Sequence, residues 1–203
     1  MTKAVQRDRH TEILKVAGEI FLELGYSATS MSKVAAAVGG SKGTLYSYFS
    51  SKEKLFEAFI REKINQKSPA VLDFPVDTKS VEKTLLSLGG KFLELLIDDQ
   101  IVSILRIAYH DAHRFPFLGH AFYEAGPQSL TFALKNYIER AHQNGDLNAP
   151  NHDIAAEQFI VLCQAKFHLP FVLGLQDAPT TKEAKAIIKA AVSTFMSAYK
   201  PNN

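Results

Sequence analysis

Residues 41–47, which follow two consecutive glycines, carry mainly small or polar side chains. A helix face of this kind can enter the major groove of DNA, which is about 12 Å wide, and a glycine lets the backbone approach base edges closely. We therefore expect base contacts from Lys42, Gly43, Thr44 and Ser47. Tyrosine hydroxyls can reach phosphate oxygens, so Tyr46 and Tyr48 are expected on the DNA backbone.

Hydroxyl and basic residues also lie at or beside the expected starts of three helices. Helix N-termini attract anions, because unpaired amides and the helix dipole point outward there. This pattern predicts phosphate contacts from Thr29, Ser30, Ser41 and Lys52. Capping of the helix itself is the alternative role for each serine.

Apolar residues recur at helical spacing along almost the whole chain, and no useful strand pattern occurs. Gly25 stands where a glycine would end the first helix, and Gly126-Pro127 is expected to bend a long helix. The pattern predicts an all-α protein of about nine helices, at residues 13–24, 30–38, 41–49, 51–64, 80–98, 100–113, 116–144, 152–173 and 181–199.

The first three helices match the helix-turn-helix plan, in which two short helices are held by a longer one. We predict a DNA-binding domain over residues 1–55 and a larger helical domain over residues 56–203. The segment from Ser68 to Lys79, which contains Pro69 and Pro75, is read as the junction between the two bodies, and the fourth helix could couple them.

Charge and composition narrow the function further. Residues 1–55 carry eight Lys/Arg against five acids, while the whole chain has a net charge of +2. A mildly basic N-terminal part suits contact with phosphate. The chain has no secretory signal, no apolar run that could span a membrane, and a single cysteine, so a cytoplasmic protein is expected.

No catalytic set or cofactor-binding loop is visible, so neither an enzyme nor a cofactor is expected. His110 and His113 share a helix face, and His120 and His168 could approach on folding. Such a pair is more typical of a polar surface or core edge than of a metal site, so no metal is predicted.

The run from Thr29 to Leu55, with Ser-Lys-Gly-Thr-Leu-Tyr at 41–46 and Ser-Lys-Glu at 51–53, closely resembles the signature of the TetR/AcrR family of transcriptional regulators. The resemblance covers about residues 10–60. It implies a repressor that forms a two-fold dimer on a palindromic operator, with the last two helices pairing between subunits. Gly40 departs from the family pattern, which has a small apolar residue there, so the angle between the two short helices is in question.

The C-terminal part resembles the AefR-type subgroup through Phe122 to Pro127 and Arg140 to Leu147. The resemblance implies a body that senses a small molecule, and the apolar lining favours a hydrophobic or amphipathic effector. The candidate pocket residues are Leu96, Tyr109, His113, Phe117, Phe122, Tyr123, Phe159, Cys163 and Phe167, although their spacing is also that of core residues. Three alternatives stay open: a monomer whose last helices close its own core, an activator or a regulator without a ligand, and an all-α small-molecule carrier whose N-terminal helices bind protein.

Overall fold

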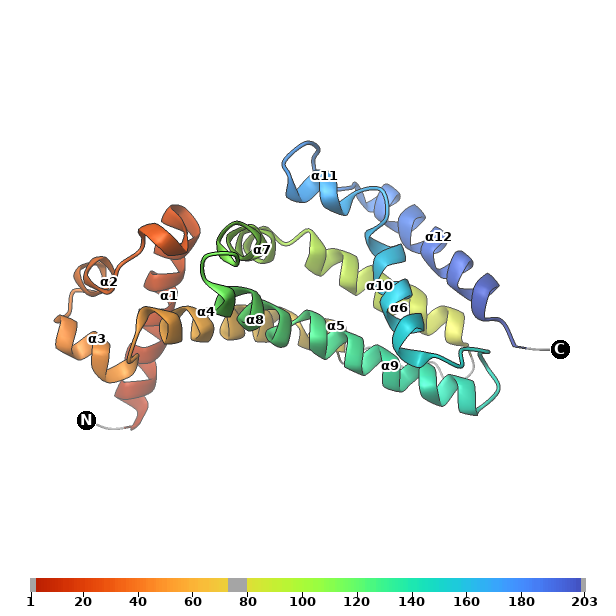
Figure 1. Ribbon diagram of the computed structural model, residues 1–203, viewed down its shortest axis with the longest axis horizontal. Coiled ribbons are helices and arrows are strands. Elements are labelled where there is room, and N and C mark those ends of the chain that lie inside the picture. Colours follow the sequence, from red (N-terminus) through yellow and green to blue (C-terminus); the bar gives the residue numbers. More distant parts are fainter. Residues whose placement is uncertain (1–2, 73–79, 202–203) are drawn as a thin grey trace. The chain divides into compact units, whose positions relative to one another are not determined.

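The computed structural model describes residues 3–72 and 80–201, and within them every regular element is a helix (Figure 1). The N-terminal helices are α1 (Lys3–Ala28), α2 (Met31–Ala37), α3 (Lys42–Tyr48) and α4 (Lys52–Lys67). The others are α5 (Pro69–Leu72), α6 (Val81–Leu96), α7 (Asp99–Asp111), α8 (Pro116–Ala125), α9 (Pro127–Gln143), α10 (His152–Gln164), α11 (His168–Val172) and α12 (Thr181–Tyr199). The all-α prediction is confirmed.

The described residues form twelve helices instead of the expected nine, because two long predicted helices are broken and the short helix α5 forms in the expected junction. Residues 116–144 form α8 and α9, which are separated at Gly126, since Pro127 starts a new helix instead of bending the old one. Residues 152–173 form α10 and α11. A proline ring clashes with the carbonyl four residues before it, and Lys166, four residues before Pro170, adopts a φ of 76°.

Two smaller differences lie near the expected boundaries. Gly25 interrupts α1 with a φ of 76°, as its position predicts, but one further turn continues to Ala28. In the expected junction, Pro69 begins the short helix α5, whereas Pro75 lies outside the described residues.

The chain divides into two compact units, and the division runs through α7. Unit 1 comprises residues 1–66 and 103–125, and unit 2 comprises residues 67–102 and 126–203. Unit 1 therefore holds α1 to α3, nearly all of α4, the second part of α7, and α8. No helix in the described part of the chain is long and apolar enough to cross a membrane.

Each unit has its own apolar core. Aromatic side chains dominate unit 1, where Phe21, Tyr26, Phe56 and Phe59 are almost fully buried. In unit 2, α10 contacts α6, α9 and α12, and α6 also packs against α12 (Figure 1). Their shared core includes Leu85, Phe159 and Phe195. These cores hold the helices of each unit in place.

Candidate nucleic-acid interface

α2 and α3 form two short helices joined by a tight turn. The Ser30 hydroxyl accepts a hydrogen bond from the Lys33 amide at 3.3 Å and caps α2. The Ser41 hydroxyl caps α3 by accepting from the Thr44 amide at 3.0 Å. Between the helices Gly39 has a φ of 70°, a left-handed conformation that favours glycine. The local sequence therefore sets both helix starts and the turn.

The inner face of α3 is anchored in the core of unit 1. Leu45 and Phe49 are buried, as is Val34 on the neighbouring helix α2. The Phe49 ring also lies 4.8 Å from the His10 ring of α1, measured between centroids. This packing leaves the opposite face of α3 turned to solvent.

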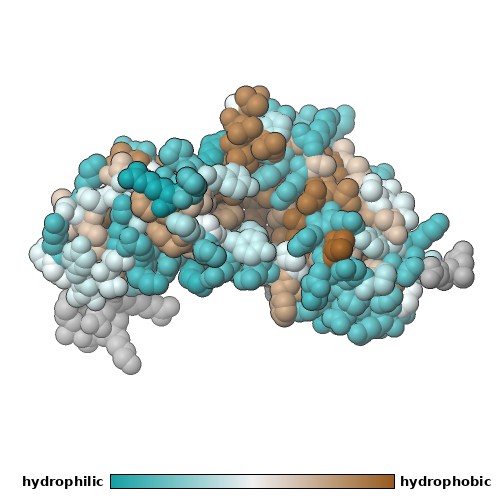
Figure 2. All heavy atoms as spheres, in the orientation of Figure 1, coloured by the Kyte–Doolittle hydropathy of each residue, from teal (hydrophilic) through white to brown (hydrophobic). Residues whose placement is uncertain are grey.

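That outer face carries Lys42, Gly43, Thr44, Tyr46 and Ser47, all exposed, and Tyr48 beside them is half-buried. The Ser47 hydroxyl donates to the Thr44 carbonyl at 2.7 Å, and the Thr44 and Ser41 hydroxyls lie 3.0 Å apart. The surface around α2 and α3 is drawn mostly in hydrophilic and intermediate colours in Figure 2. α3 therefore presents small and polar groups, one lysine and an exposed tyrosine ring.

Gly43 is not required by the structure of unit 1. A Cβ built there would meet only the Ser41 hydroxyl, at an ordinary 3.6 Å, and the backbone does not adopt a positive φ. Glycine in a helix is less favourable than alanine by about 0.5–1 kcal/mol. Nothing within unit 1 therefore requires a glycine at this exposed helical position.

At Gly40, where the chain leaves the family pattern, an arginine from α1 fills the adjacent space. A Cβ at Gly40 would lie 3.1 Å from the guanidinium of Arg9. That guanidinium donates to the Val38 carbonyl at 3.1 Å and pairs with Glu12 at 2.7 Å. Arg9 therefore ties α1 to the turn between α2 and α3. No local pattern marked Arg9, because its partners lie up to 29 residues away.

Thr29 was expected to contact phosphate, but the structure gives it an internal role. Its side chain is 2% exposed, and its hydroxyl donates to the Gly25 carbonyl at 2.8 Å. The carbonyl of Gly25 lies where the helix is interrupted and needs a donor. Thr29 is thus a correction to the set of phosphate contacts: its hydroxyl satisfies the end of α1.

Lys52 is likewise engaged within unit 1. Its ammonium donates to the carbonyls of Tyr26 and Thr29, both at 2.9 Å, and lies 4.0 Å from the centre of the Tyr26 ring. Burial lowers the pKa of Lys52 from its usual value. Lys52 therefore joins the start of α4 to the end of α1, and its contact with phosphate stays a prediction.

Tyr26 sits at the centre of this junction. Its hydroxyl donates to Glu53 at 3.0 Å, and the centres of the Phe115 and Phe117 rings lie 5.0 and 5.2 Å from the centre of its ring in T-shaped arrangements. Burial, followed by the hydrogen bond to Glu53, raises the pKa of Tyr26 far above its usual value, so the phenol stays protonated. Tyr26 thus packs α1 and α4 against the segment that leads into α8.

The end of α7 meets the same junction through a carboxylate. Asp111 is 6% exposed and accepts a hydrogen bond from the Ser27 hydroxyl at 3.2 Å. The His110 ring nitrogen lies 3.0 Å from the same carboxylate oxygen. His113, which shares a helix face with His110 in the sequence pattern, is exposed. The described part of the chain holds no group of three His, Cys, Asp or Glu residues placed to bind a metal.

The predicted ligand-binding residues are divided between the two units. Phe159, Cys163 and Phe167 are buried in the core of unit 2 together with Leu96, and burial raises the pKa of the Cys163 thiol to about 12. The others belong to unit 1, where Tyr109, His113 and Tyr123 are exposed and Phe117 and Phe122 are half-buried. Neither unit by itself brings the whole set together.

Comparison with known proteins gives two family matches. The family described as bacterial regulatory proteins of the tetR family matches residues 13–59. The AefR-like transcriptional repressor, C-terminal domain, matches residues 83–201, more than half of the chain. The first match contains α2 and α3 completely, and the second contains α7 to α12 completely.

Individual relatives agree with these matches. The solved structure of the flavonoid-responsive regulator FrrA is 32% identical, with a TM-score of 0.87, and the alignment covers 97% of this chain and 99% of that one. A TetR family regulator from Pseudomonas syringae shares the fold at 24% identity, with a TM-score of 0.75 and coverage of 94% and 96%. The fatty acid metabolism regulator protein of Bacillus subtilis is 27% identical over 49% of this chain, which spans about half, 52%, of that relative.

Proposed function

Since the chain belongs to the TetR family of DNA-binding transcriptional regulators, with an AefR-like C-terminal domain, we propose that it acts as a dimeric repressor. In this proposal α3 of each subunit enters the major groove at one half of a palindromic operator. A small hydrophobic or amphipathic molecule releases the DNA. Because the partner is chromosomal DNA, the protein acts in the cytoplasm.

The observation that carries this proposal is the outer face of α3, with its exposed Gly43 that nothing inside unit 1 requires. In the proposed complex Lys42, Gly43 and Thr44 face base edges. The exposed hydroxyl of Tyr46 binds a phosphate oxygen, as do Tyr48 and the capping serines Ser30 and Ser41. Ser47 contacts a base with its remaining acceptor capacity, since its proton is given to the Thr44 carbonyl.

Thr29 and Lys52 have a different part in the proposal. Both hold the loop between α1 and α2 and so position the helix-turn-helix, and the third N–H of the Lys52 ammonium can still donate to a phosphate oxygen. We assign residues 1–55 to DNA binding and residues 56–203 to effector binding and dimerisation. The compact unit 1 extends beyond residue 55, and this supports a DNA-binding part that is braced by α7 and α8.

Dimerisation is proposed through α10 and α12, whose exposed faces include apolar and small residues. Ile154 and Val161 of α10 are 49% and 63% exposed. Both line a groove of about 470 Å³ between the two helices. α12 adds exposed small residues at helical spacing, namely Ala186, Ala190, Ser193 and Ser197. Small side chains allow close helix approach, and exposed apolar groups at a helix face favour burial against a partner.

Release of DNA is proposed to pass through α7, because α7 belongs to both units. Its C-terminal Asp111 binds Ser27 at the end of α1, and the following Phe115 packs on Tyr26. A shift of α7 would therefore move the helix-turn-helix. The effector need only bind the released conformation better, and a 100-fold preference supplies about 2.7 kcal/mol.

The names of two relatives support a small effector with a large apolar part. One regulator is flavonoid-responsive by its name, and another regulates fatty acid metabolism. On this basis we propose a planar aromatic or aliphatic molecule with few polar groups, in the size range of ordinary protein pockets.

The test is selection of a binding site from random duplex DNA, followed by a binding assay with Tyr46→Ala and with Lys182→Ala as the control. Lys182 is exposed at the start of α12, far along the chain from α3. The proposal expects a palindromic site that Tyr46→Ala binds more weakly and Lys182→Ala binds normally. Equal binding by both variants would overturn the placement of α3. Transcription from the selected site distinguishes a repressor from an activator.

A further inference from the structure

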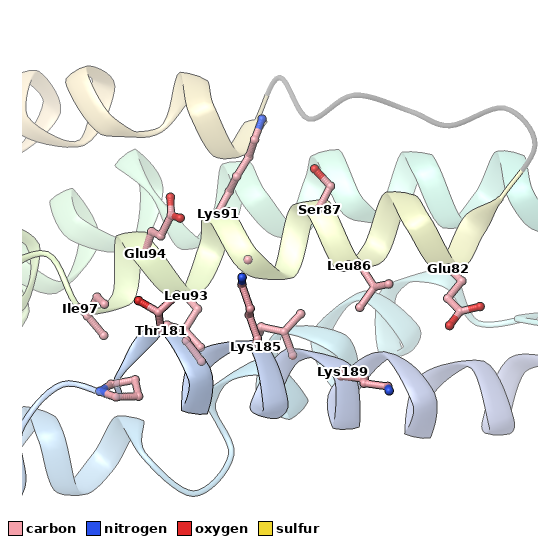
Figure 3. A pocket seen from close by; sticks show the side chains of 14 residues that line it. Glu82, Leu86, Ser87, Lys91, Leu93, Glu94, Ile97, Thr181, Lys185 and Lys189 are labelled. Atoms are coloured by element: carbon pink, nitrogen blue, oxygen red, sulfur yellow. The ribbon is translucent and has the colours of Figure 1, made fainter.

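Unit 2 contains a groove between α6 and α12 that none of the predicted ligand-binding residues lines (Figure 3). Its volume is about 600 Å³, within the range of small-molecule sites, about 300–1,000 Å³. Leu86, Leu93 and Ile188 supply apolar surface. In Figure 3 Leu86 of α6 points toward α12, and Lys185 of α12 points toward α6.

Two consecutive glycines in α6 shape this groove. A Cβ at Gly89 would lie 2.8 Å from Ile188, so the missing side chain lets α6 and α12 pack closely. A Cβ at Gly90 would meet nothing within 4 Å, so the missing side chain there leaves open space. Gly90 lines the groove, and a side chain at this position would occupy it.

The charged groups of the groove are arranged unevenly. Lys185 and Lys189 lie one helical turn apart on α12, and neither forms an ion pair with any described residue. Figure 3 shows Glu82 of α6 at one end of the groove, and Glu94 and Lys91 toward the other end. In Figure 3 Lys185 projects between the helices, whereas Glu94 points away from α12. The central charge of the groove is therefore positive.

We propose that this groove binds an amphipathic anion, a carboxylate with an apolar body. The apolar body covers Leu86 and Leu93, and the carboxylate accepts hydrogen bonds from Lys185, with Lys189 close by. An apolar ligand over this surface would partly remove the Lys185 ammonium from water, which is unfavourable unless the ligand supplies a negative partner. A cationic head group would meet uncompensated ammonium groups instead.

The site rests on unit 2 of the proposed regulator and does not require DNA binding. Calorimetry of the full-length protein without DNA therefore tests it separately, with decanoate as the probe and decan-1-ol as its uncharged match. We expect saturable decanoate binding that Lys185→Gln weakens about tenfold, because a charged hydrogen bond is lost. Decan-1-ol binding should not change in this variant. Lys182→Gln, on the same helix but outside the groove, should stay within about twofold.

Gly90→Leu provides a second and independent test, because its side chain would fill the groove without displacing packed atoms. This variant should lose both decanoate and decan-1-ol binding while its melting temperature is retained. Absence of saturable decanoate binding to the wild type would overturn the proposal, as would equal affinity of Lys185→Gln and Lys182→Gln. A change of oligomeric state in Gly90→Leu would show that the groove receives a second copy of the chain instead.

Discussion

Replacing Gly43 by alanine should move protein stability and DNA affinity in opposite directions. The added Cβ meets only the Ser41 hydroxyl, at 3.6 Å, so it causes no clash within unit 1. Because alanine restricts the unfolded chain more than glycine does, the substitution should stabilise the fold by about 0.4–1 kcal/mol. For a protein of this size, such a gain raises the melting temperature by about 1–4 °C.

The same methyl group should weaken DNA binding. In the proposed complex the backbone at Gly43 lies against base edges, and an extra methylene-sized group in a closely packed contact costs about 1–3 kcal/mol. This corresponds to a loss of about fivefold to 150-fold in affinity at each half-site. Fluorescence anisotropy with the selected operator measures the loss, and differential scanning calorimetry measures the gain in stability.

Gly90→Ala is the matched control, since Gly90 likewise lies in a helix, α6, and a Cβ there meets nothing within 4 Å. It should raise the melting temperature without changing operator affinity. Two results would refute the reasoning. A lower melting temperature for Gly43→Ala would mean that unit 1 itself requires the glycine, and unchanged affinity would mean that DNA does not approach this part of α3.

Three further perturbations test the junction of unit 1 and the proposed dimer. Lys52→Ala should lower the free energy of unfolding, measured by denaturant titration, by about 1–3 kcal/mol, because two carbonyls lose their donor. The control Lys54→Ala breaks an exposed ion pair and should lower it by less than about 1 kcal/mol. The pKa of Glu53 is lowered, mainly by a hydrogen bond from Ser51. The ionised carboxylate therefore stabilises the fold at pH values above the usual pKa of a glutamate, and this contribution is lost as the pH falls through the lowered pKa of Glu53. The stability gap between wild type and Glu53→Gln, measured by thermal unfolding, should therefore close in acid, and a constant gap would contradict this assignment. Val161→Glu should convert the dimer to a monomer in analytical ultracentrifugation, whereas Gln143→Glu, exposed on α9, should not.

The short-range features of the DNA-binding part were predictable from the sequence. The caps Ser30 and Ser41 and the turn at Gly39 depend on neighbours within three or four residues, so the pattern alone identifies them. Thr29 and Lys52 belong to the same pattern, but their partners become visible only when α1, α2 and α4 pack together. Helix spacing cannot distinguish a hydroxyl that faces solvent from one that is buried.

The C-terminal part was less predictable, for a related reason. Helical spacing identifies buried residues such as Phe159, but buried residues that fill a core and those that line a cavity follow the same spacing. The groove between α6 and α12 depends on a missing side chain at Gly90, and an absent group leaves no periodic signal. The helix break at Lys166 could have been inferred from Pro170, because a proline ring clashes with the carbonyl of the residue four positions earlier.

The central claim is that α3 binds DNA, and a salt titration with Lys42→Ala tests it most directly. Anisotropy of the selected operator is measured over a range of salt concentrations for the wild type, Lys42→Ala and the control Lys182→Ala. We predict a steep fall of wild-type affinity with salt, and weaker binding by Lys42→Ala at every salt concentration, with the control unchanged. Binding that is independent of salt, or identical for the two lysine variants, would contradict the account.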